Sequence, residues 1–267
     1  MMHMEQQMCR PRHARIQAAP MGFGLSFDQP PVLFSGLSNP TSIVNCVAWY
    51  RSDLLVTQSG GTVSAWGDSS GSGDTNRNAL QATGSLQPTY SASDANFNNL
   101  PSLTCALGTG RLLRTGTWSV ALPQPYTVFA VARLLSAQAN SYLCDSINGG
   151  LQSAVYSSSG ADLRAYNGSN SNSTTFSSAQ TGVAIGVMDS ANTASRVYWS
   201  AATPSAGAAN GTNGLTGVTL GCYAGGGTTF TDWAFTEFAY YSRALTTGEI
   251  AKLNAYAAGR YAITIGP

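Results

Sequence analysis

The sequence predicts an all-β protein, a sandwich of two antiparallel sheets with one short helix near its C-terminal end. From about residue 44, short segments rich in Val, Phe, Tyr, Thr and Trp alternate with Gly, Ser and Asn, as strands alternate with turns. No helical pattern separates these segments, which excludes a parallel α/β sheet. Hydrophobic residues make up 43% of the 267 residues, enough for a packed core.

Four segments show the strand pattern most clearly. The stretch 128–131 is apolar at every position, which is typical of a central strand that is buried on both faces. The predicted strands are 126–133, 182–188, 195–199 and 233–241.

One helix is predicted over 245–261. Thr246 and Glu249 have the spacing of a capping box, in which each side chain accepts a hydrogen bond from a backbone N–H of the first turn. The apolar residues that recur at helical spacing and would face the sandwich are Ile250, Leu253, Ala257 and Tyr261.

The charge is unusually low. Charged residues are 9% of the chain, against a typical value of about 25%. A net charge of +1 excludes a general nucleic-acid binder, which needs a dense field of Lys and Arg. No apolar run approaches the ~20 residues that cross a bilayer, so no membrane contact is predicted. The N-terminal segment also lacks the apolar centre of a signal peptide.

The composition divides the chain into an extended N-terminal arm, residues 1–43, and a sandwich domain, residues 44–267. The arm is rich in Pro and Gly and is too short to form its own core. Two alternatives remain open, a disordered tail and an arm that becomes ordered against a partner subunit. Apolar residues that would anchor such an arm are Phe23, Phe27, Val32, Leu33 and Phe34.

Cysteine and histidine give no metal-binding pattern. The five cysteines are scattered without a CxxC pair, which favours core residues or free thiols over a disulfide framework. Both histidines lie in the first fifteen residues, far from any cysteine cluster. No cofactor is therefore predicted, with calcium as the one candidate ion.

That candidate comes from a loop rich in oxygen atoms. Asp68 and Asp74 flank a Ser/Gly run, and calcium takes six to eight oxygen ligands. The alternative is a hydrogen-bonded turn in which Asp68 accepts backbone N–H groups. The same loop contains Gly67-Asp-Ser-Ser-Gly71, but a serine nucleophile needs a base, and both histidines lie in the arm.

The order of several short motifs resembles a known family. They run Trp49-Tyr-Arg-Ser-Asp53, Val63-Ser-Ala-Trp-Gly-Asp68, Gln87-Pro-Thr-Tyr90, Leu100-Pro-Ser-Leu103 and Phe235-Thr-Glu-Phe-Ala-Tyr-Tyr-Ser-Arg-Ala-Leu245. This series, which covers about residues 44–263, resembles the concanavalin A-like, laminin-G-like jelly-roll modules of phage virion and bacterial surface proteins. The resemblance implies two curved antiparallel sheets, Trp49 and Trp66 in the core, and carbohydrate or protein binding without catalysis.

The superfamily that the motif series resembles also includes glucanases, so the sequence is searched for their catalytic carboxylates. Retaining glycosidases need two carboxylates about 5–5.5 Å apart. Of the three glutamates, Glu5 lies in the arm and Glu249 caps the helix. Glu237 has Asp232 as its nearest acidic neighbour, and an odd separation places the two on opposite faces of a regular strand. The sequence therefore predicts a protein that is not an enzyme.

Aromatic residues beside polar loops are the candidate ligand-binding residues, because sugars stack on aromatic rings and bind amides and hydroxyls. Core packing is the alternative for each of them. These candidates are Trp118, Tyr166, Trp199 and Tyr223.

Together these features predict a lectin-like virion structural or decoration protein. The arm would attach it to other subunits of an oligomeric assembly, and the sandwich would bind host surface glycans. The alternatives are a carbohydrate-active enzyme of the same fold and an exported cell-surface adhesion module.

Overall fold

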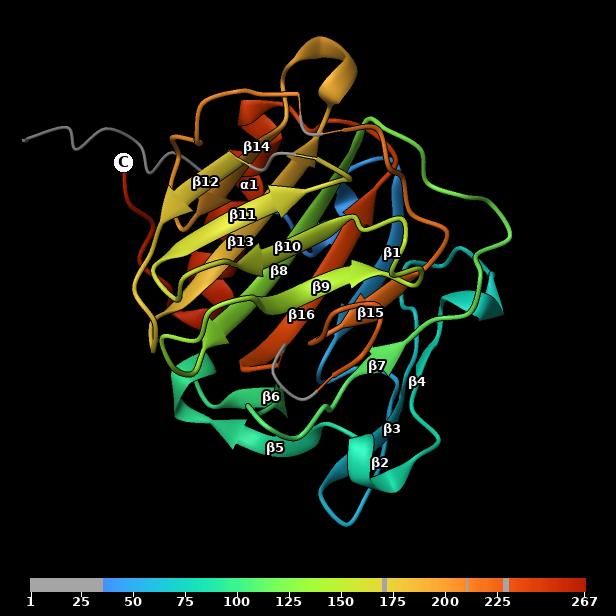
Figure 1. Ribbon diagram of the computed structural model, residues 1–267. Coiled ribbons are helices and arrows are strands. Elements are labelled where there is room, and N and C mark those ends of the chain that lie inside the picture. The colour runs from blue at the N-terminus through green and yellow to red at the C-terminus, as the bar shows by residue number, and fades with distance from the viewer. Residues whose placement is uncertain (1–35, 170–171, 210, 228–230) are drawn as a thin grey trace, which may run out of the picture. The chain divides into compact units, whose positions relative to one another are not determined.

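The structure, a computed structural model, describes residues 36–169, 172–209, 211–227 and 231–267. Within these residues the strands form one continuous path that folds back on itself to make two layers (Figure 1). Every pairing between the named strands of this part of the chain is antiparallel. The predicted all-β sandwich of antiparallel strands with one C-terminal helix is confirmed.

The front layer in Figure 1 contains seven strands. Most of them are short, and their inward residues alternate with residues that face away from the core. In spatial order they are β12 (Asn172–Thr175), β11 (Asp162–Tyr166), β10 (Ala154–Ser157), β9 (Ser141–Ser146), β15 (Val218–Leu220), β7 (Leu113–Arg114) and β4 (Ala79–Leu80).

The back layer holds the longest strands. They coincide with the four predicted segments to within one residue at each end, and β8 lies between two neighbours, as its apolar sequence predicts. The back strands are β14 (Arg196–Trp199), β13 (Thr181–Met188), β8 (Tyr126–Leu134), β16 (Trp233–Tyr241) and, beside β16, β1 (Cys46–Arg51).

Four strands lie at the end where the layers join, three of them on the path between the layers and the first paired with one of these three. Short 3-10 helices lie in the connections. The strands are β2 (Val56–Ser59), β3 (Thr62–Trp66), β5 (Thr89–Asp94) and β6 (Leu100–Cys105). The 3-10 helices are η1 (Pro40–Ser42), η2 (Thr75–Arg77), η3 (Gly84–Leu86), η4 (Ala95–Phe97) and η5 (Ser190–Asn192).

Two hydrophobic clusters stabilise the fold. The first fills the space between the layers and includes Trp66, which stacks on Phe235 with 6.0 Å between ring centroids. The second lies between the back layer and the helix α1 (Thr247–Tyr261) and includes Trp49. Trp49 and Trp66 are both buried, as the sequence predicts.

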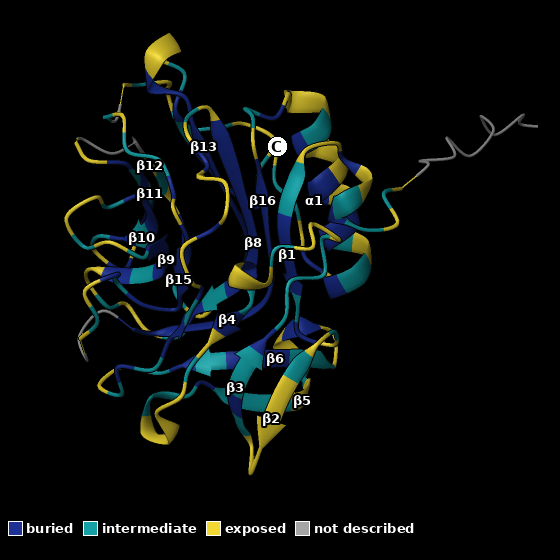
Figure 2. Cartoon of the chain, turned by 90° about the vertical axis from the view of Figure 1, so that its right-hand side faces the viewer, coloured by how far each residue is buried: buried dark blue, intermediate teal, exposed yellow. Residues whose placement is uncertain are grey.

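Helix α1 covers the outer face of the back layer, on the side of the molecule away from β9–β12 (Figure 2). It begins with the predicted capping box, in which the Thr246 hydroxyl accepts from the Glu249 N–H and the Glu249 carboxylate accepts from the Thr246 N–H. The four predicted apolar residues of the helix are buried. No helix of the described residues is both long enough and apolar enough to span a membrane.

The segment that precedes β1 lies against the back layer. Ile43 is buried, and the Tyr241 hydroxyl donates to the Pro40 carbonyl at 3.0 Å. The five proposed arm anchors between Phe23 and Phe34 lie outside the described residues, so the arm and its boundary stay predictions. Within the described residues, Cys46, Cys105, Cys144 and Cys222 are free thiols.

Candidate functional site

Four tyrosines form a row across the outer face of the front layer. Tyr166 lies on β11, Tyr156 on β10, Tyr142 on β9, and Tyr223 on the turn that follows β15. All four side chains are half-buried. The strand residues beside three of them point inward, since Leu143, Val155 and Ala165 belong to the cluster between the layers.

Strand register aligns these rings. Tyr156 pairs with Tyr142 across β10 and β9, and their rings stack with 5.0 Å between centroids and 15° between planes. The two end rings are turned away from this stack. Tyr166 lies 6.5 Å from Tyr156 at 89°, and Tyr223 lies 5.4 Å from Tyr142 at 52°. Because the central rings cover each other's faces, they present mainly edges and hydroxyl groups to solvent.

Neighbouring loops place hydrogen-bonding groups along the row. Gln152 Nε2 donates to Tyr142 Oη at 3.2 Å, and Tyr223 Oη donates to the Gly149 carbonyl at 3.2 Å. Burial raises the pKa of Tyr142 to about 12, so its phenol stays protonated at neutral pH. The row therefore combines hydrocarbon edges with neutral hydroxyl and amide groups, which is the composition of a site for uncharged polar ligands.

Charge at the β11 end of the row is balanced. Arg164 pairs with Tyr156 across the strands and forms an ion pair with Asp162, with 2.6 Å between Nε and Oδ2. Partial burial raises the pKa of Asp162, but the Ser158 hydroxyl and the Arg164 guanidinium outweigh it and lower that pKa to about 2. This end of the row therefore adds no net charge at neutral pH.

At the other end of the row, Asp145 connects two neighbouring segments of the chain through hydrogen bonds. Its carboxylate is buried and accepts from the N–H groups of Ser146 at 2.7 Å, Ser153 at 3.0 Å and Ala224 at 3.0 Å. Burial raises the pKa of Asp145 to about 6, against the opposing effect of these N–H groups. One carboxylate thus joins the loop that carries Gln152 to the turn that carries Tyr223.

The two tryptophans predicted as ligand-binding residues, Trp118 and Trp199, lie outside the tyrosine row. Trp118 is 3% exposed and packs edge-on against Tyr240, with 5.9 Å between ring centroids. Trp199 is 7% exposed and lies 4.8 Å from Phe176, on the wall of a hollow of about 420 Å³. Both rings belong to the cluster between the layers, so the outer row does not include them.

Of the four residues in the row, Tyr166 and Tyr223 are ligand-binding candidates in the sequence, whereas the two central ones, Tyr142 and Tyr156, are not. Tyr142 and Tyr156 lie on short strands that were not among the clear strand predictions. Neither Ser141–Ser146 nor Ala154–Ser157 shows a regular alternation that would place these tyrosines outward, and their stacking depends on the register of the two strands.

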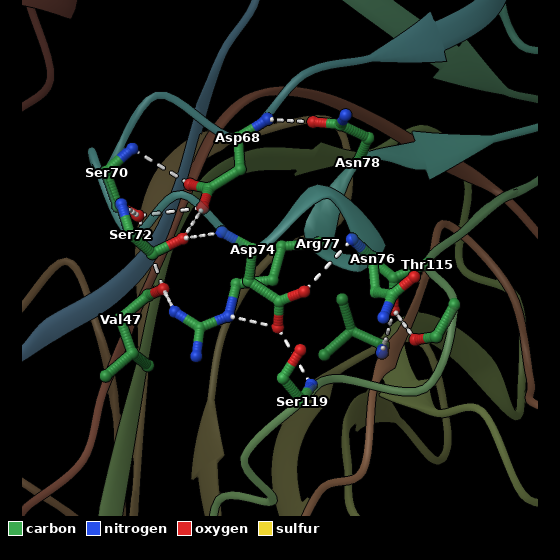
Figure 3. Close-up of polar contacts among 12 residues, drawn as sticks. Val47, Asp68, Ser70, Ser72, Asp74, Asn76, Arg77, Asn78, Thr115 and Ser119 are labelled. Atoms are coloured by element: carbon green, nitrogen blue, oxygen red, sulfur yellow. Dashed lines mark hydrogen bonds and ion pairs between the residues drawn. The ribbon is translucent and has the colours of Figure 1, made fainter.

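The predicted calcium loop is closed by hydrogen bonds (Figure 3). Asp68 Oδ1 accepts from the N–H groups of Trp49 at 2.8 Å and Ser70 at 2.9 Å, and its Oδ2 accepts from the hydroxyls of Ser70 and Ser72, both at 2.8 Å. These donors direct hydrogen atoms at the oxygens that a cation would need. These contacts are those expected of the hydrogen-bonded turn, and calcium binding at this loop stays a prediction.

Asp74 closes the other side of the loop. It accepts from the Ser119 N–H at 2.8 Å and forms an ion pair with Arg77, with 3.5 Å between Oδ2 and Nε (Figure 3). The Ser119 N–H and the Arg77 guanidinium lower the pKa of Asp74. Among the described residues, no group of three His, Cys, Asp or Glu side chains is placed to hold a metal.

Glu237 holds helix α1 and has no solvent contact. Its carboxylate accepts from Trp49 Nε1 at 2.6 Å, from Tyr261 Oη at 2.7 Å and from Tyr256 Oη at 3.1 Å. The residue is 0% exposed, and burial raises its pKa. Substrate therefore cannot reach this carboxylate while the helix is packed.

Strand alternation does not relate Asp232 to Glu237 as expected, because Asp232 precedes β16 and the strand itself is irregular. The pairing of β16 with β8 shifts between Phe235 and Glu237, which is a β-bulge at Thr236. Ala234 consequently lies in the cluster beneath α1, and Glu237 accepts from Trp49, Tyr256 and Tyr261 of the same cluster, although an odd number of positions separates Ala234 from Glu237. Simple alternation fails because the bulge adds one residue to the strand.

Comparisons with known proteins give similar folds only. No family model and no curated protein sequence matches the chain. Domain 4 of AbnA, a GH43 extracellular arabinanase from Geobacillus stearothermophilus, in complex with arabinotriose, has a TM-score of 0.54 at 14% identity, covering 79% of this chain and 98% of that one. Trypanosoma rangeli sialidase in complex with 2,3-difluoro-KDN has a TM-score of 0.50 at 15% identity, covering 79% and 32%.

The chain thus spans about a third of the length of the sialidase chains that it matches. These likenesses establish a β-sandwich fold that also occurs within carbohydrate-active proteins. They also correct the sequence analysis. Its prediction that the protein is not an enzyme is wrong, because the same fold occurs within a sialidase and within a GH43 arabinanase, and the fold offers no ground for excluding one.

Proposed function

We propose that the chain is a carbohydrate-recognising sandwich that binds glycans through the tyrosine row of the front layer. The observation that carries this proposal is the alignment of Tyr166, Tyr156, Tyr142 and Tyr223 on one outer face. Half-buried tyrosines offer apolar contact area and hydroxyl groups at a small cost in side-chain entropy. Their neutral surroundings suit sugar hydroxyls better than phosphates or acidic peptides.

The arabinanase neighbour supports the same proposal, because its domain 4 was solved with arabinotriose and shares this fold over nearly all of its length. The finer assignment to laminin-G-like modules rests on the motif series that ends in the strand and helix at 233–261. Binding without a bound metal is expected, since the loop of Asp68 and Asp74 is already occupied by protein donors.

A binding screen tests the proposal. The full chain is run by affinity electrophoresis through gels that contain arabinan, β-glucan, xylan, mannan or galactan. Retardation by at least one polymer is expected, and it should be lost in the double variant Tyr142→Ala/Tyr156→Ala. Equal retardation of the wild type and the double variant would place the binding site elsewhere, and no retardation by any polymer would contradict carbohydrate recognition.

A carbohydrate-active enzyme is the second candidate, and the observation that favours it is the fold shared with the sialidase and the arabinanase domain. Asp162 is the carboxylate at the end of the tyrosine row, and its low pKa keeps it ionised, as a nucleophile or an electrostatic stabiliser requires. Release of reducing ends from the same polymers, abolished by Asp162→Asn, would establish this function. Release that persists in that variant would exclude Asp162 from the reaction.

Attachment to a larger assembly, such as a virion or a cell surface, completes the proposal. Because residues 37–43 contact the sandwich, a deletion that tests the arm should end at residue 35. Loss of incorporation into the assembly, with unchanged glycan binding, is the expected result. Full incorporation of the shortened chain would contradict an attachment role for the arm.

A further inference from the structure

A groove continues the tyrosine row on the same face of the molecule. It has a volume of about 550 Å³ and lies between β4, β7 and the turn after Tyr223. Leu80 on β4 is 54% exposed and offers an apolar side chain at the edge of the groove. The main lining residues are Leu80, Gln81, Leu86, Leu112, Arg114 and Gly225.

The turn after β15 joins the groove to the row. Gly225 lines the groove, and a Cβ atom built on it would lie 2.4 Å from Cε1 of Tyr223. The backbone of this turn therefore packs directly against the last ring of the row. A side chain at Gly225 would collide with Tyr223 and separate the two features.

Strand order makes the row and the groove one continuous band. From β11 the neighbouring strands are β10, β9, β15, β7 and β4, so the band crosses six strands from Tyr166 to Leu80 (Figure 1). Strands lie about 4.8 Å apart, which gives the band a length of roughly 24 Å. The direction of the band is perpendicular to the strands, and its features repeat at the strand spacing.

The charge along the band is low. Arg114 is the one charged residue among those that line the groove. Its Nε donates to Thr219 Oγ1 on β15 at 3.2 Å and its Nη2 donates to the Ala224 carbonyl, so Arg114 joins β15 to the turn that carries Tyr223. At the other end, Asp162 and Arg164 neutralise each other.

From this geometry we infer that the ligand is a linear, uncharged glycan bound along its length, from Tyr166 to the groove at Leu80. The inference rests on the proposed function and gives it a substrate class. A repeat of aromatic and polar groups at the strand spacing matches the repeat of a polymer, whereas a terminal sugar would need one enclosed pocket. With about one sugar unit for each strand spacing, about five sugar units cover the roughly 24 Å of the band.

A length series tests the inference. Calorimetric affinities are measured for arabino-oligosaccharides and cello-oligosaccharides of one to six units, with oligogalacturonides of the same lengths as charged probes. For at least one neutral series, the affinity should rise at least tenfold between two and five units and then level off. Equal affinity for one unit and five units, or tighter binding of the oligogalacturonides, would overturn the inference.

A groove variant tests whether the ligand reaches β4. Leu80→Asp should weaken binding of the five-unit ligand about tenfold and end the rise of affinity at about three units. The matched control is Val44→Asp, because Val44 is 68% exposed on the turn before β1 in the other layer, and it should bind as the wild type does. Unfolding temperatures of both variants report whether they fold.

The possible failures are distinct. An unchanged length dependence in a folded Leu80→Asp variant overturns the extended site and leaves glycan binding by the row intact. Absence of binding by every oligosaccharide, together with a silent polymer screen, overturns the proposed function itself.

Discussion

Tyr142 and Tyr156 stack with 5.0 Å between their ring centroids although they lie on different strands, and this pair is the centre of the candidate site. The pairing of β9 and β10 shifts between Val155 and Tyr156. Because Val155 pairs with Cys144 and Tyr156 pairs with Tyr142, this bulge brings the rings of Tyr142 and Tyr156 opposite each other. A local irregularity of the sheet thus aligns the row.

Removal of a central ring should weaken glycan binding. We expect Tyr156→Ala to lower the affinity for a five-unit oligosaccharide about tenfold, which corresponds to about 1.4 kcal/mol of binding free energy. Tyr156→Phe should keep the stacking and lose only the hydroxyl contribution, so its affinity should lie between those of the wild type and the alanine variant. Calorimetric titration measures all three.

The matched control for these variants is Tyr90→Ala, because Tyr90 is also half-buried but lies on β5, outside the row. It should bind as the wild type does. A loss of affinity in Tyr90→Ala as large as that in Tyr156→Ala would mean that the loss reflects general destabilisation.

Asp145 should give the stability of the protein a characteristic pH dependence. Its pKa in the folded chain is about 6, above the ordinary value of 3.8, so between these pH values the folded chain binds a proton that the unfolded chain does not. The contribution of this group to the free energy of unfolding therefore increases as the pH falls from about 6 to about 4, by about 3 kcal/mol at most.

Denaturant unfolding of wild type and Asp145→Asn between pH 4 and pH 7 measures this contribution. The difference in unfolding free energy between the two proteins should favour the wild type more strongly at pH 4 than at pH 7. A difference that stays constant over this range would show that Asp145 keeps an ordinary pKa in the folded chain.

Glu237 should be essential for stability. Glu237→Ala leaves three buried donors, on Trp49, Tyr256 and Tyr261, without their acceptor. We expect the free energy of unfolding to fall by about 3 kcal/mol or more. Asp53→Ala is the control, since it removes a partly exposed carboxylate that pairs with Arg51 and Arg260, at an expected cost of about 0–1 kcal/mol. Equal losses in the two variants would refute the supporting role of Glu237.

The capping box should contribute measurably to helix α1. Thr246→Ala removes the hydroxyl that accepts from the Glu249 N–H, and we expect a loss of about 1 kcal/mol in the free energy of unfolding. Thr247→Ala at the next position, which caps nothing, should cost less than about 0.5 kcal/mol. Urea denaturation of both variants distinguishes the two effects, and similar losses would count against the cap.

Calcium should have little effect on stability. The Asp68 oxygens already accept four hydrogen bonds, and a cation would have to displace their donors. The unfolding temperature is therefore expected to be the same in EDTA and in millimolar calcium. A rise of several degrees in calcium that disappears in Asp68→Ala would instead establish the loop as a calcium site.

The parts of the fold that follow from local pattern could be predicted from the sequence. Val128 to Val131 are apolar on both faces because β8 is covered by core on one side and by α1 on the other. The helix was predictable because Thr246 and Glu249 interact within a single turn. Such features depend on residues that are close in sequence.

The candidate site depends on contacts that the sequence does not encode locally. The row needs the register of β9, β10 and β11, and the first of these pairings contains a bulge. A bulge in β16 is also the reason why simple alternation does not give the face on which Glu237 lies. Trp118 and Trp199 lie next to polar loops in the sequence, but each ring points into the core, and neighbouring residues do not reveal that direction.

Tyrosine-selective NMR tests the central claim most directly. The full chain carries ¹³C-labelled tyrosine rings and is titrated with the oligosaccharide that binds best. If the row binds the glycan, the signals of Tyr142, Tyr156, Tyr166 and Tyr223, assigned by single Tyr→Phe substitutions, should shift, and the signal of the buried Tyr240 should not. Binding that leaves the four front-layer signals unmoved would contradict glycan binding by the row.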